Sequence, residues 1–170
     1  MSDVYAGAPS ERSAPDGIQH GIVVAVVLTW RGRIGLFKRS WAVGSDAGLW
    51  HCVTGYVEQG VPAGNQALCE LFEETGLCVV DLTGFRAGPV LRLADPRGGF
   101  WTVHTFHAQT ERRRLELNWE HLAYRWVRPC YVARFTGQVP WLRDALHAVL
   151  TPDDSAGIGG RRRVCARSGS

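Results

Sequence analysis

The chain has 170 residues, and 45% of them are hydrophobic, which is enough for one domain with its own core. The net charge of +3 is too small to indicate nucleic-acid binding, and much of it comes from arginines near the C-terminus. The longest apolar run, residues 22–28, is too short to cross a bilayer, and the N-terminus lacks the apolar run of a signal peptide. We therefore expect no membrane and no nucleic acid among the partners.

The cysteines favour a reducing compartment. They show no C-x-x-C pairing and no histidine at zinc spacing, and their number is odd, so we expect free thiols and a cytoplasmic protein. The five residues are Cys52, Cys69, Cys78, Cys130 and Cys165.

The first part of the chain reads as a disordered segment followed by strands. Residues 1–17 are rich in Ser, Pro, Ala and Gly, which predicts disorder. The next element, residues 18–30, is apolar on both faces and predicts a buried strand. Two more strands are expected, the first after the Arg31-Gly32 turn and the second after a loop at 45–48. They span residues 33–39 and 50–57.

The second part predicts two helices and the rest of a sheet. A helix is expected over residues 62–75, with Pro62 in its first turn and Gly76 just after its last. A turn is expected at 95–99, a second helix at 140–150 and a flexible basic tail at 151–170. The remaining strands are expected at 78–85, 90–93, 100–110 and 120–127. Strands that bracket helices in this order favour a mixed sheet between helices.

Three carboxylates lie on one face of the helix predicted at 62–75. Glu70, Glu73 and Glu74 are spaced i, i+3 and i+4, where like charges destabilise a bare helix by a few tenths of a kcal/mol per pair. A divalent cation would reverse that sign, and oxygen ligands at this density suit magnesium, with manganese as the alternative. The competing interpretation is a solvated acidic face, which the flanking glycines make less favourable. The side chains expected to pack into the core from the opposite face are Leu68, Leu71, Phe72 and Thr75.

The stretch from Gly55 to Leu77 resembles the Nudix box, G-x5-E-x7-R-E-U-x-E-E-x-G-U, where U is aliphatic. Gly55 matches the first glycine, and residues 70–77 match the second half without a gap. Val61 stands where the family has Glu, and Cys69 stands where it has Arg. Those two side chains form an ion pair in the family, and replacing both partners with apolar residues can be nearly neutral. We therefore expect the double change to affect loop rigidity more than metal binding.

Two flanking runs resemble bacterial dihydroneopterin triphosphate pyrophosphohydrolases. Residues 50–60 are similar to their W-x-x-V-T-G-x-V-E-x-G run, and residues 120–126 to their E-H-L-A-Y-K-W segment. The resemblance covers residues 18–150 and implies an α/β fold, a Nudix-like α/β/α sandwich with a mixed sheet. It also implies metal-dependent hydrolysis of a diphosphate bond in a nucleoside triphosphate-like substrate, with dihydroneopterin triphosphate as one candidate and pyrophosphate as a product.

The resemblance also assigns roles to the acids. It implies that Glu70 and Glu74 bind the metal, with Glu73 close behind, and that a carboxylate accepts the proton of the attacking water. A further carboxylate from outside the box is expected, and Glu120 is the candidate because it begins the Glu-His-Leu-Ala-Tyr run. A surface Glu at a strand start is its alternative. Glu58 is a weaker candidate, for which a plain loop acid is the better interpretation. We thus expect Glu70, Glu73 and Glu120 to be catalytic. The expected metal ligands are Glu70, Glu73, Glu74 and Glu120.

Several residues are candidates for substrate binding. Lys38 and Arg39 close a predicted strand and could meet phosphates, although an exposed strand end is an equal alternative. Trp50 and Tyr124 could stack on a base or pterin ring, as could Trp101, for which core packing is favoured. The box turn at Gly55 is expected to face the substrate. Four of the six histidines form no nucleophile pattern and are interpreted as structural; they are His51, His104, His107 and His121.

Two other functions stay open at this point. The altered box is compatible with a Nudix hydrolase of a specialised-pathway nucleotide, which would keep the mechanism and change the substrate. A non-catalytic Nudix domain that binds a nucleotide or a protein is the second alternative, and the three clustered acids argue against it. A homodimer is also left open.

Overall fold

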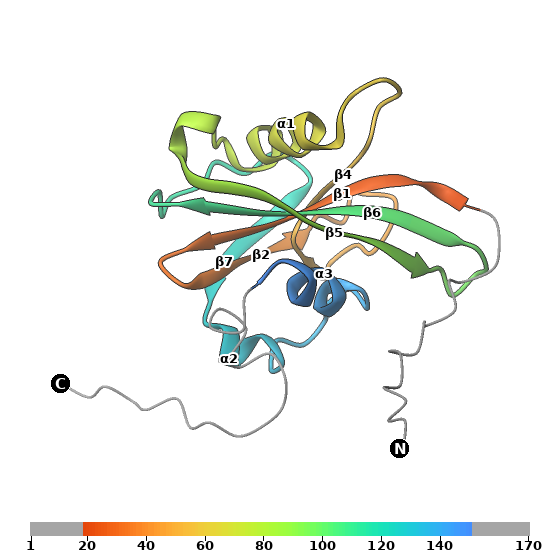
Figure 1. Cartoon of the computed structure of the whole chain (residues 1–170). Coiled ribbons are helices and arrows are strands. Elements are labelled where there is room, and N and C mark those ends of the chain that lie inside the picture. The colour runs from red at the N-terminus through yellow and green to blue at the C-terminus, as the bar shows by residue number, and fades with distance from the viewer. Residues whose placement is uncertain (1–18, 151–170) are drawn as a thin grey trace, which may run out of the picture.

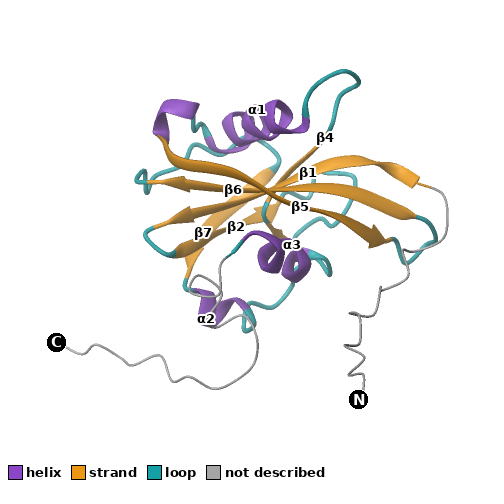
Figure 2. Cartoon of the chain, in the orientation of Figure 1, coloured by secondary structure: helices purple, strands orange, loops and turns teal. Residues whose placement is uncertain are grey.

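A computed structural model describes residues 19–150 of the chain (Figure 1). Seven strands form one mixed sheet, and α1 covers one face while α2 and α3 lie on the other (Figure 2). The strands are β1 (Gln19–Trp30), β2 (Arg33–Arg39), β3 (Trp50–His51), β4 (Val53–Tyr56), β5 (Leu82–Ala94), β6 (Phe100–Thr110) and β7 (His121–Val127). The helices are α1 (Ala63–Thr75), α2 (Pro129–Val132), α3 (Leu142–Val149) and the 3-10 helix η1 (Val79–Asp81). The predicted α/β/α sandwich is confirmed. The segments predicted as disordered or flexible, 1–17 and 151–170, lie outside the described residues.

β1 runs through the middle of the sheet and is buried on both faces. It pairs parallel with β6, whereas the other pairings are antiparallel. Its side chains alternate between two cores: Val24 and Val26 belong to the core beneath α1, and Ala25 and Val27 to the core beneath α3. Because both faces are covered, the strand is continuously apolar, as a strand buried on both sides must be.

β1 and β2 separate soon after their turn, and β3 and β4 lie in the gap between them. The two long strands pair only at Thr29↔Ile34 and Trp30↔Arg33. Beyond that point β3 pairs with β2, and β4 pairs with β1 over residues 23–26. The strand predicted at 50–57 is therefore two short strands, because the chain changes partner at Cys52. This insertion brings Gly55 into the sheet directly beneath α1.

Three predicted elements differ from the structure. The strands expected at 78–85 and 90–93 form the single strand β5, with irregular pairing between Ala87 and Val90, where Pro89 cannot donate a hydrogen bond. Residues 79–81 form η1 instead of a strand. The short helix α2 was not predicted, and α3 begins at Leu142 rather than at residue 140.

α1 ends as predicted but buries a different face. Gly76 adopts the left-handed conformation (φ 71°) and donates its N–H to the Phe72 carbonyl, whereas Pro62 precedes the helix as its N-cap. The prediction that Phe72 packs into the core is wrong, since it is 54% exposed, and Glu74 is only 1% exposed. The buried positions Ala67, Leu71 and Glu74 recur at i, i+4 and i+7, so the acid lies on the core-facing side of the helix.

The structure also shows the state of the cysteines and the lengths of the helices. Cys52, Cys69 and Cys78 are free, as predicted. Cys130 is disulfide-bonded, so the free-thiol prediction is wrong for that residue, and Cys165 lies outside the described part of the chain. Within residues 19–150 the helices are too short or too polar to traverse a bilayer.

Candidate active site

Glu70 lies in a cradle made by β4 and its own helix. Its carboxyl group rests on Gly55: a Cβ at that glycine would be 1.9 Å from both Cδ and Oε1 of Glu70. Gln66, one turn earlier, donates from Nε2 to Glu70 Oε1 over 2.9 Å. Burial raises the pKa of Glu70, and the charges of Glu73, Glu120 and Glu58 add to the rise, while the Gln66 hydrogen bond opposes it. Gly55 is thus required for the space it leaves to a carboxylate.

Glu74 is the most deeply buried acid of the group. Its side chain lies beneath α1, and the Thr54 backbone N–H donates a hydrogen bond to it. Burial raises the pKa of Glu74 well above its usual value, and the nearby charges of Glu120 and Glu70 raise it further; Thr54 and Arg39 act against the rise. Its Oε2 atom has no hydrogen-bond partner among the described residues. Glu74 therefore offers a buried oxygen that is ready to accept a cation or a proton.

Two histidines lie next to that oxygen. His121 Nε2 is 3.4 Å from Glu74 Oε2 and 3.0 Å from His51 Nε2, and the two imidazole rings are stacked. Burial lowers the pKa of His51 well below its usual value and the pKa of His121 to about 4. Both rings are therefore neutral at pH 7, so the contact with Glu74 is not an ion pair. Because only one proton fits between two facing ring nitrogens, the pair has a single donor at that contact.

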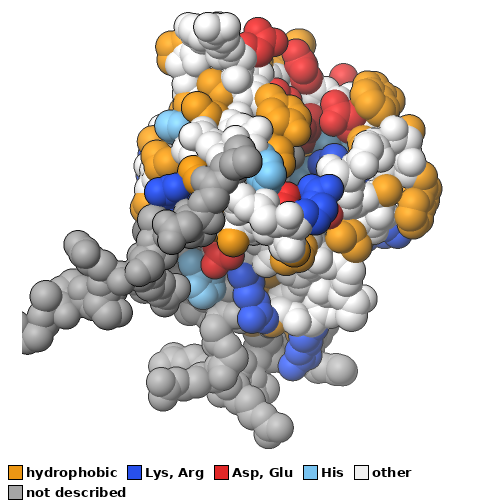
Figure 3. Space-filling model, turned by 90° about the vertical axis from the view of Figure 1, so that its right-hand side faces the viewer, with side chains coloured by type: hydrophobic (Ala, Val, Ile, Leu, Met, Phe, Trp, Pro, Cys, Tyr) orange, Lys and Arg blue, Asp and Glu red, His pale blue; other side chains and the backbone are white. Residues whose placement is uncertain are grey.

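Glu120 joins the same group from the segment that leads into β7. It directly precedes β7, where its N–H donates to Asn118 Oδ1 over 3.0 Å and its Oε1 accepts from Asn118 Nδ2 over 3.4 Å. Its charge raises the pKa of both Glu70 and Glu74. Glu73 is exposed on α1. Figure 3 shows acidic side chains gathered at the top of this face, beside a recess in which a cationic group is visible.

Of the two predicted phosphate-binding cations, only Arg39 reaches the carboxylates. Arg39 ends β2, and its charge lowers the pKa values of Glu74, His51 and His121. Its Nε donates to the Ser45 carbonyl over 2.9 Å. Lys38 Nζ instead lies 6.0 Å from the centre of the Trp50 ring, on the α3 side of the sheet.

The predicted stacking residues lie apart from the carboxylates. Trp50 packs edge-on against Phe135 with 4.9 Å between ring centres. The Tyr124 hydroxyl donates to the Arg113 carbonyl over 3.3 Å, and the Trp101 indole donates to Asp95 over 3.3 Å. Each ring is thus engaged in packing or hydrogen bonding, and the structure brings none of them to the acidic group.

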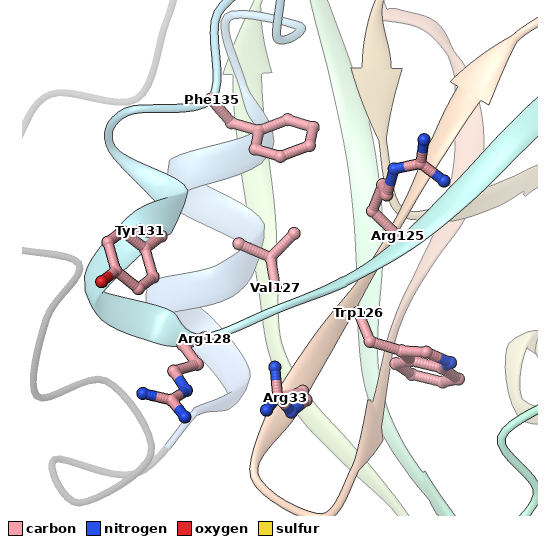
Figure 4. Close-up of a pocket in the computed structure, with 7 residues that line it drawn as sticks. All are labelled: Arg33, Arg125, Trp126, Val127, Arg128, Tyr131 and Phe135. Carbon is pink, nitrogen blue, oxygen red and sulfur yellow. The ribbon is translucent and has the colours of Figure 1, made fainter. Parts of the chain in front are cut away.

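A pocket lies at the far end of β7, apart from the acidic group. It is lined by Arg33, Arg125, Trp126, Val127, Arg128, Tyr131 and Phe135 (Figure 4). The guanidinium groups of Arg125 and Arg128 point in different directions, so these two arginines do not converge on one anion (Figure 4). Since Val127 pairs with Ile34 while His121 pairs with Arg39, this pocket is separated from Glu120 by the length of the strand.

The site is not a preassembled metal centre. Among residues 19–150, no group of three or more His, Cys, Asp or Glu side chains is arranged to hold an ion. The donor chemistry nevertheless suits one, because Glu70 and Glu74 have pKa values raised partly by like charge and Glu74 Oε2 lacks a donor. In the box loop Val61 is half-buried, and Cys69 is an exposed free thiol, so their contact stays a prediction.

The family model for the NUDIX domain matches residues 19–148. The chain belongs to the NUDIX domain family. This confirms the predicted membership and, at the level of the family, the predicted class of enzyme, a Nudix hydrolase acting on phosphorus anhydrides. No curated protein matches the chain with significance.

Solved structures of the same fold include several Nudix proteins. A MutT protein from Methanosarcina mazei Go1 is 20% identical, with a TM-score of 0.63 over 81% of this chain and 94% of that one. The E. coli dihydroneopterin triphosphate pyrophosphohydrolase is 24% identical, with a TM-score of 0.62 over 74% and 92%. The NUDIX domain of Shewanella oneidensis NrtR, complexed with ADP ribose, is 17% identical, with a TM-score of 0.61 over 75% and 85%. At these identities the likeness establishes the fold.

Proposed function

We propose that this Nudix hydrolase cleaves a phosphoanhydride bond of a nucleoside triphosphate-like substrate and releases pyrophosphate, with dihydroneopterin triphosphate as the first candidate. The observation that carries the proposal is the buried Glu74, which lies close enough to Glu70 and Glu120 for each charge to raise its pKa. Such a group of acids destabilises the fold unless it has a cationic ligand to bind. The fold shared with the E. coli dihydroneopterin triphosphate pyrophosphohydrolase supports the choice of candidate.

Glu70, Glu74 and Glu120 would hold a divalent cation, magnesium or manganese, with Glu73 at the exposed side of the group. Carboxylate oxygens are the ligands that both ions prefer. When bound, the ion would neutralise phosphate charge and lower the pKa of a bound water. Glu74 Oε2 has no hydrogen-bond donor among the described residues, and such an ion would give this oxygen a partner.

Residues around the acids would position the catalytic carboxylates and balance their charge. Gly55 and Gln66 fix the position of the Glu70 carboxylate. A carboxylate with a raised pKa accepts a proton from water more readily than an ordinary one, which suits the acids of this group as general bases. The positive charge of Arg39, which lowers the pKa of Glu74, would reduce repulsion between the phosphates of the substrate and the acids.

A substrate panel tests this proposal. The full chain would be incubated with magnesium and with dihydroneopterin triphosphate, GTP, ADP-ribose or diadenosine tetraphosphate, and both products of each reaction would be identified by phosphorus NMR. We expect pyrophosphate and the corresponding monophosphate from a triphosphate substrate, and no products with Glu70→Gln or Glu74→Gln. Release of orthophosphate, or full activity in either variant, would contradict the proposal.

A further inference from the structure

Two tryptophans lie just beyond the end of the pairing between β2 and β7, next to Glu120. The pairing of the strands reaches Arg39↔His121, and the Ser40 N–H then donates to the Glu120 carbonyl over 2.6 Å. Trp41 follows Ser40 and Trp119 precedes Glu120. The two indoles therefore extend from neighbouring stretches of backbone. Trp119 directly precedes the predicted catalytic acid, and Trp41 follows the residue that is hydrogen-bonded to the carbonyl of that acid. Neither tryptophan was singled out from the sequence, because only the strand register brings them together.

These two side chains differ from the other tryptophans in exposure. Trp41 is 72% exposed and Trp119 is 68% exposed. The other five of the seven tryptophans are half-buried, and most pack against one of the two hydrophobic cores. An exposed apolar patch rimmed by polar groups is typical of a binding surface. Figure 3 shows hydrophobic side chains on the right-hand side of this face, next to the acidic group.

The ring of Trp41 is held in position by the loop that follows it. A Cβ at Gly48, whose φ is +74°, would be 2.4 Å from Cη2 of Trp41, so the indole rests directly on the glycine backbone. The loop is closed by hydrogen bonds from Arg39 N to Leu49 O (2.9 Å) and from Gly48 N to Arg39 O (3.0 Å). A ring that is already ordered loses less conformational entropy when a ligand stacks on it.

We propose that Trp41 and Trp119 form the subsite for the flat heterocycle of the substrate, a purine or a pterin. This inference rests on the proposed function, since it takes the phosphates of the same molecule to the carboxylates. An indole offers a fused-ring ligand a large face for stacking with little entropy to lose. Glu120 and Arg39 adjoin both the ring subsite and the acidic group, so one substrate can span the two.

Equilibrium binding measurements with two stable probes test the subsite. The first is α,β-methylene-GTP, whose α–β bridge cannot be hydrolysed, and the second is methylenediphosphonate, which has no ring. With magnesium present, we expect Trp41→Ala and Trp119→Ala each to weaken binding of α,β-methylene-GTP by roughly five- to hundredfold. Binding of methylenediphosphonate should stay unchanged. Trp41→Phe should retain most of the affinity, and Gly48→Ala should lose it by displacing the Trp41 ring.

Tyr131→Ala, on α2 at the far end of β7, is the matched control and should bind both probes as the wild type does. Equal weakening of both probes in the tryptophan variants would overturn the inference, since the residues would then not act on the ring. The same conclusion follows if wild-type protein binds α,β-methylene-GTP no more tightly than methylenediphosphonate. Ring-dependent binding without hydrolysis of any triphosphate would refute the proposed function alone.

Discussion

Glu74 is a buried acid whose neighbours make its charged form costly. Burial and the charges of Glu120 and Glu70 raise its pKa. An unfolded chain releases this proton near the ordinary carboxyl pKa, while the folded chain releases it only at higher pH. Across that interval the folded state binds more protons, so the free energy of unfolding falls as pH rises. In the metal-free protein, the ionisation of Glu74 should therefore lower the free energy of unfolding at neutral pH relative to acidic pH.

We expect Glu74→Gln to raise the free energy of unfolding in metal-free buffer at neutral pH, because the amide keeps the shape and removes the charge. The gain should shrink as pH falls below the ordinary carboxyl pKa, where the wild-type acid is protonated in both states. Urea unfolding of both proteins over a pH series with a chelator would measure it. A variant that is less stable than wild type at neutral pH would show that the charge of Glu74 is already compensated.

His121 provides the polar surroundings of Glu74 and His51. His121→Phe keeps a ring of similar shape but leaves His51 Nε2 facing carbon, without its hydrogen-bond partner. Leaving such a buried group unsatisfied costs about 1–3 kcal/mol, so the free energy of unfolding should fall by that order. His147→Phe, at an exposed position of α3, is the control and should change it little. Denaturant unfolding at pH 7 is the measurement, and equal stability of the two variants would contradict the assigned role.

At the scale of elements, the fit of α1 on β4 depends on one glycine. Gly55→Ala would put a methyl group into the space of the Glu70 carboxyl, which is the mobile end of a side chain, so the fold should persist while the carboxylate moves. A displacement of about 1 Å in a catalytic group can lower the rate of hydrolysis by about a hundredfold. Gly64→Ala, in α1, is the control, because a Cβ there would come no closer than 3.8 Å to another side chain. It should leave the rate of hydrolysis unchanged and stabilise the helix by up to about 1 kcal/mol. Steady-state hydrolysis and thermal melting of the two variants would compare them.

The box positions that depart from the family form a second test of this element. Because Cys69 is exposed, an Arg there would reach solvent, and an ion pair with an acid at position 61 should couple by less than about 1 kcal/mol. A double-mutant cycle of Val61→Glu and Cys69→Arg, scored by denaturant unfolding, measures that coupling. We expect the double variant to be more stable than the sum of the single effects, and strictly additive effects would mean that the two positions do not touch.

Local sequence patterns predicted most helices and strands correctly. They failed for the features that depend on which elements pair or pack with one another. The alternation in residues 100–110 and the apolar run after residue 18 gave β6 and β1 nearly residue for residue. The burial of Glu74 was missed, because a strand inserted between β1 and β2 decides which side of α1 is covered. The merging of two predicted strands into β5 has a similar cause, since β6 continues past Pro89 and keeps both halves in register.

At the scale of the whole molecule, the candidate site is assembled from segments that are distant in sequence. Glu70 and Glu74 come from α1, Glu120 from the start of β7 and Arg39 from the end of β2. The box and the Glu120 run could be found by resemblance, because they are contiguous motifs. Separating Arg39 from Lys38, and finding Trp41 and Trp119, required the register of β2 against β7, which a single sequence does not contain.

The central claim is that the acids of α1 bind a divalent cation. Calorimetric titration of manganese into the metal-free chain tests it without knowledge of the substrate. The control is Glu111→Gln, which removes an exposed acid that is paired with Arg31. We predict saturable binding to the wild type and to Glu111→Gln, and its loss in Glu74→Gln. Binding to Glu74→Gln with the affinity and stoichiometry of the wild type would contradict the account.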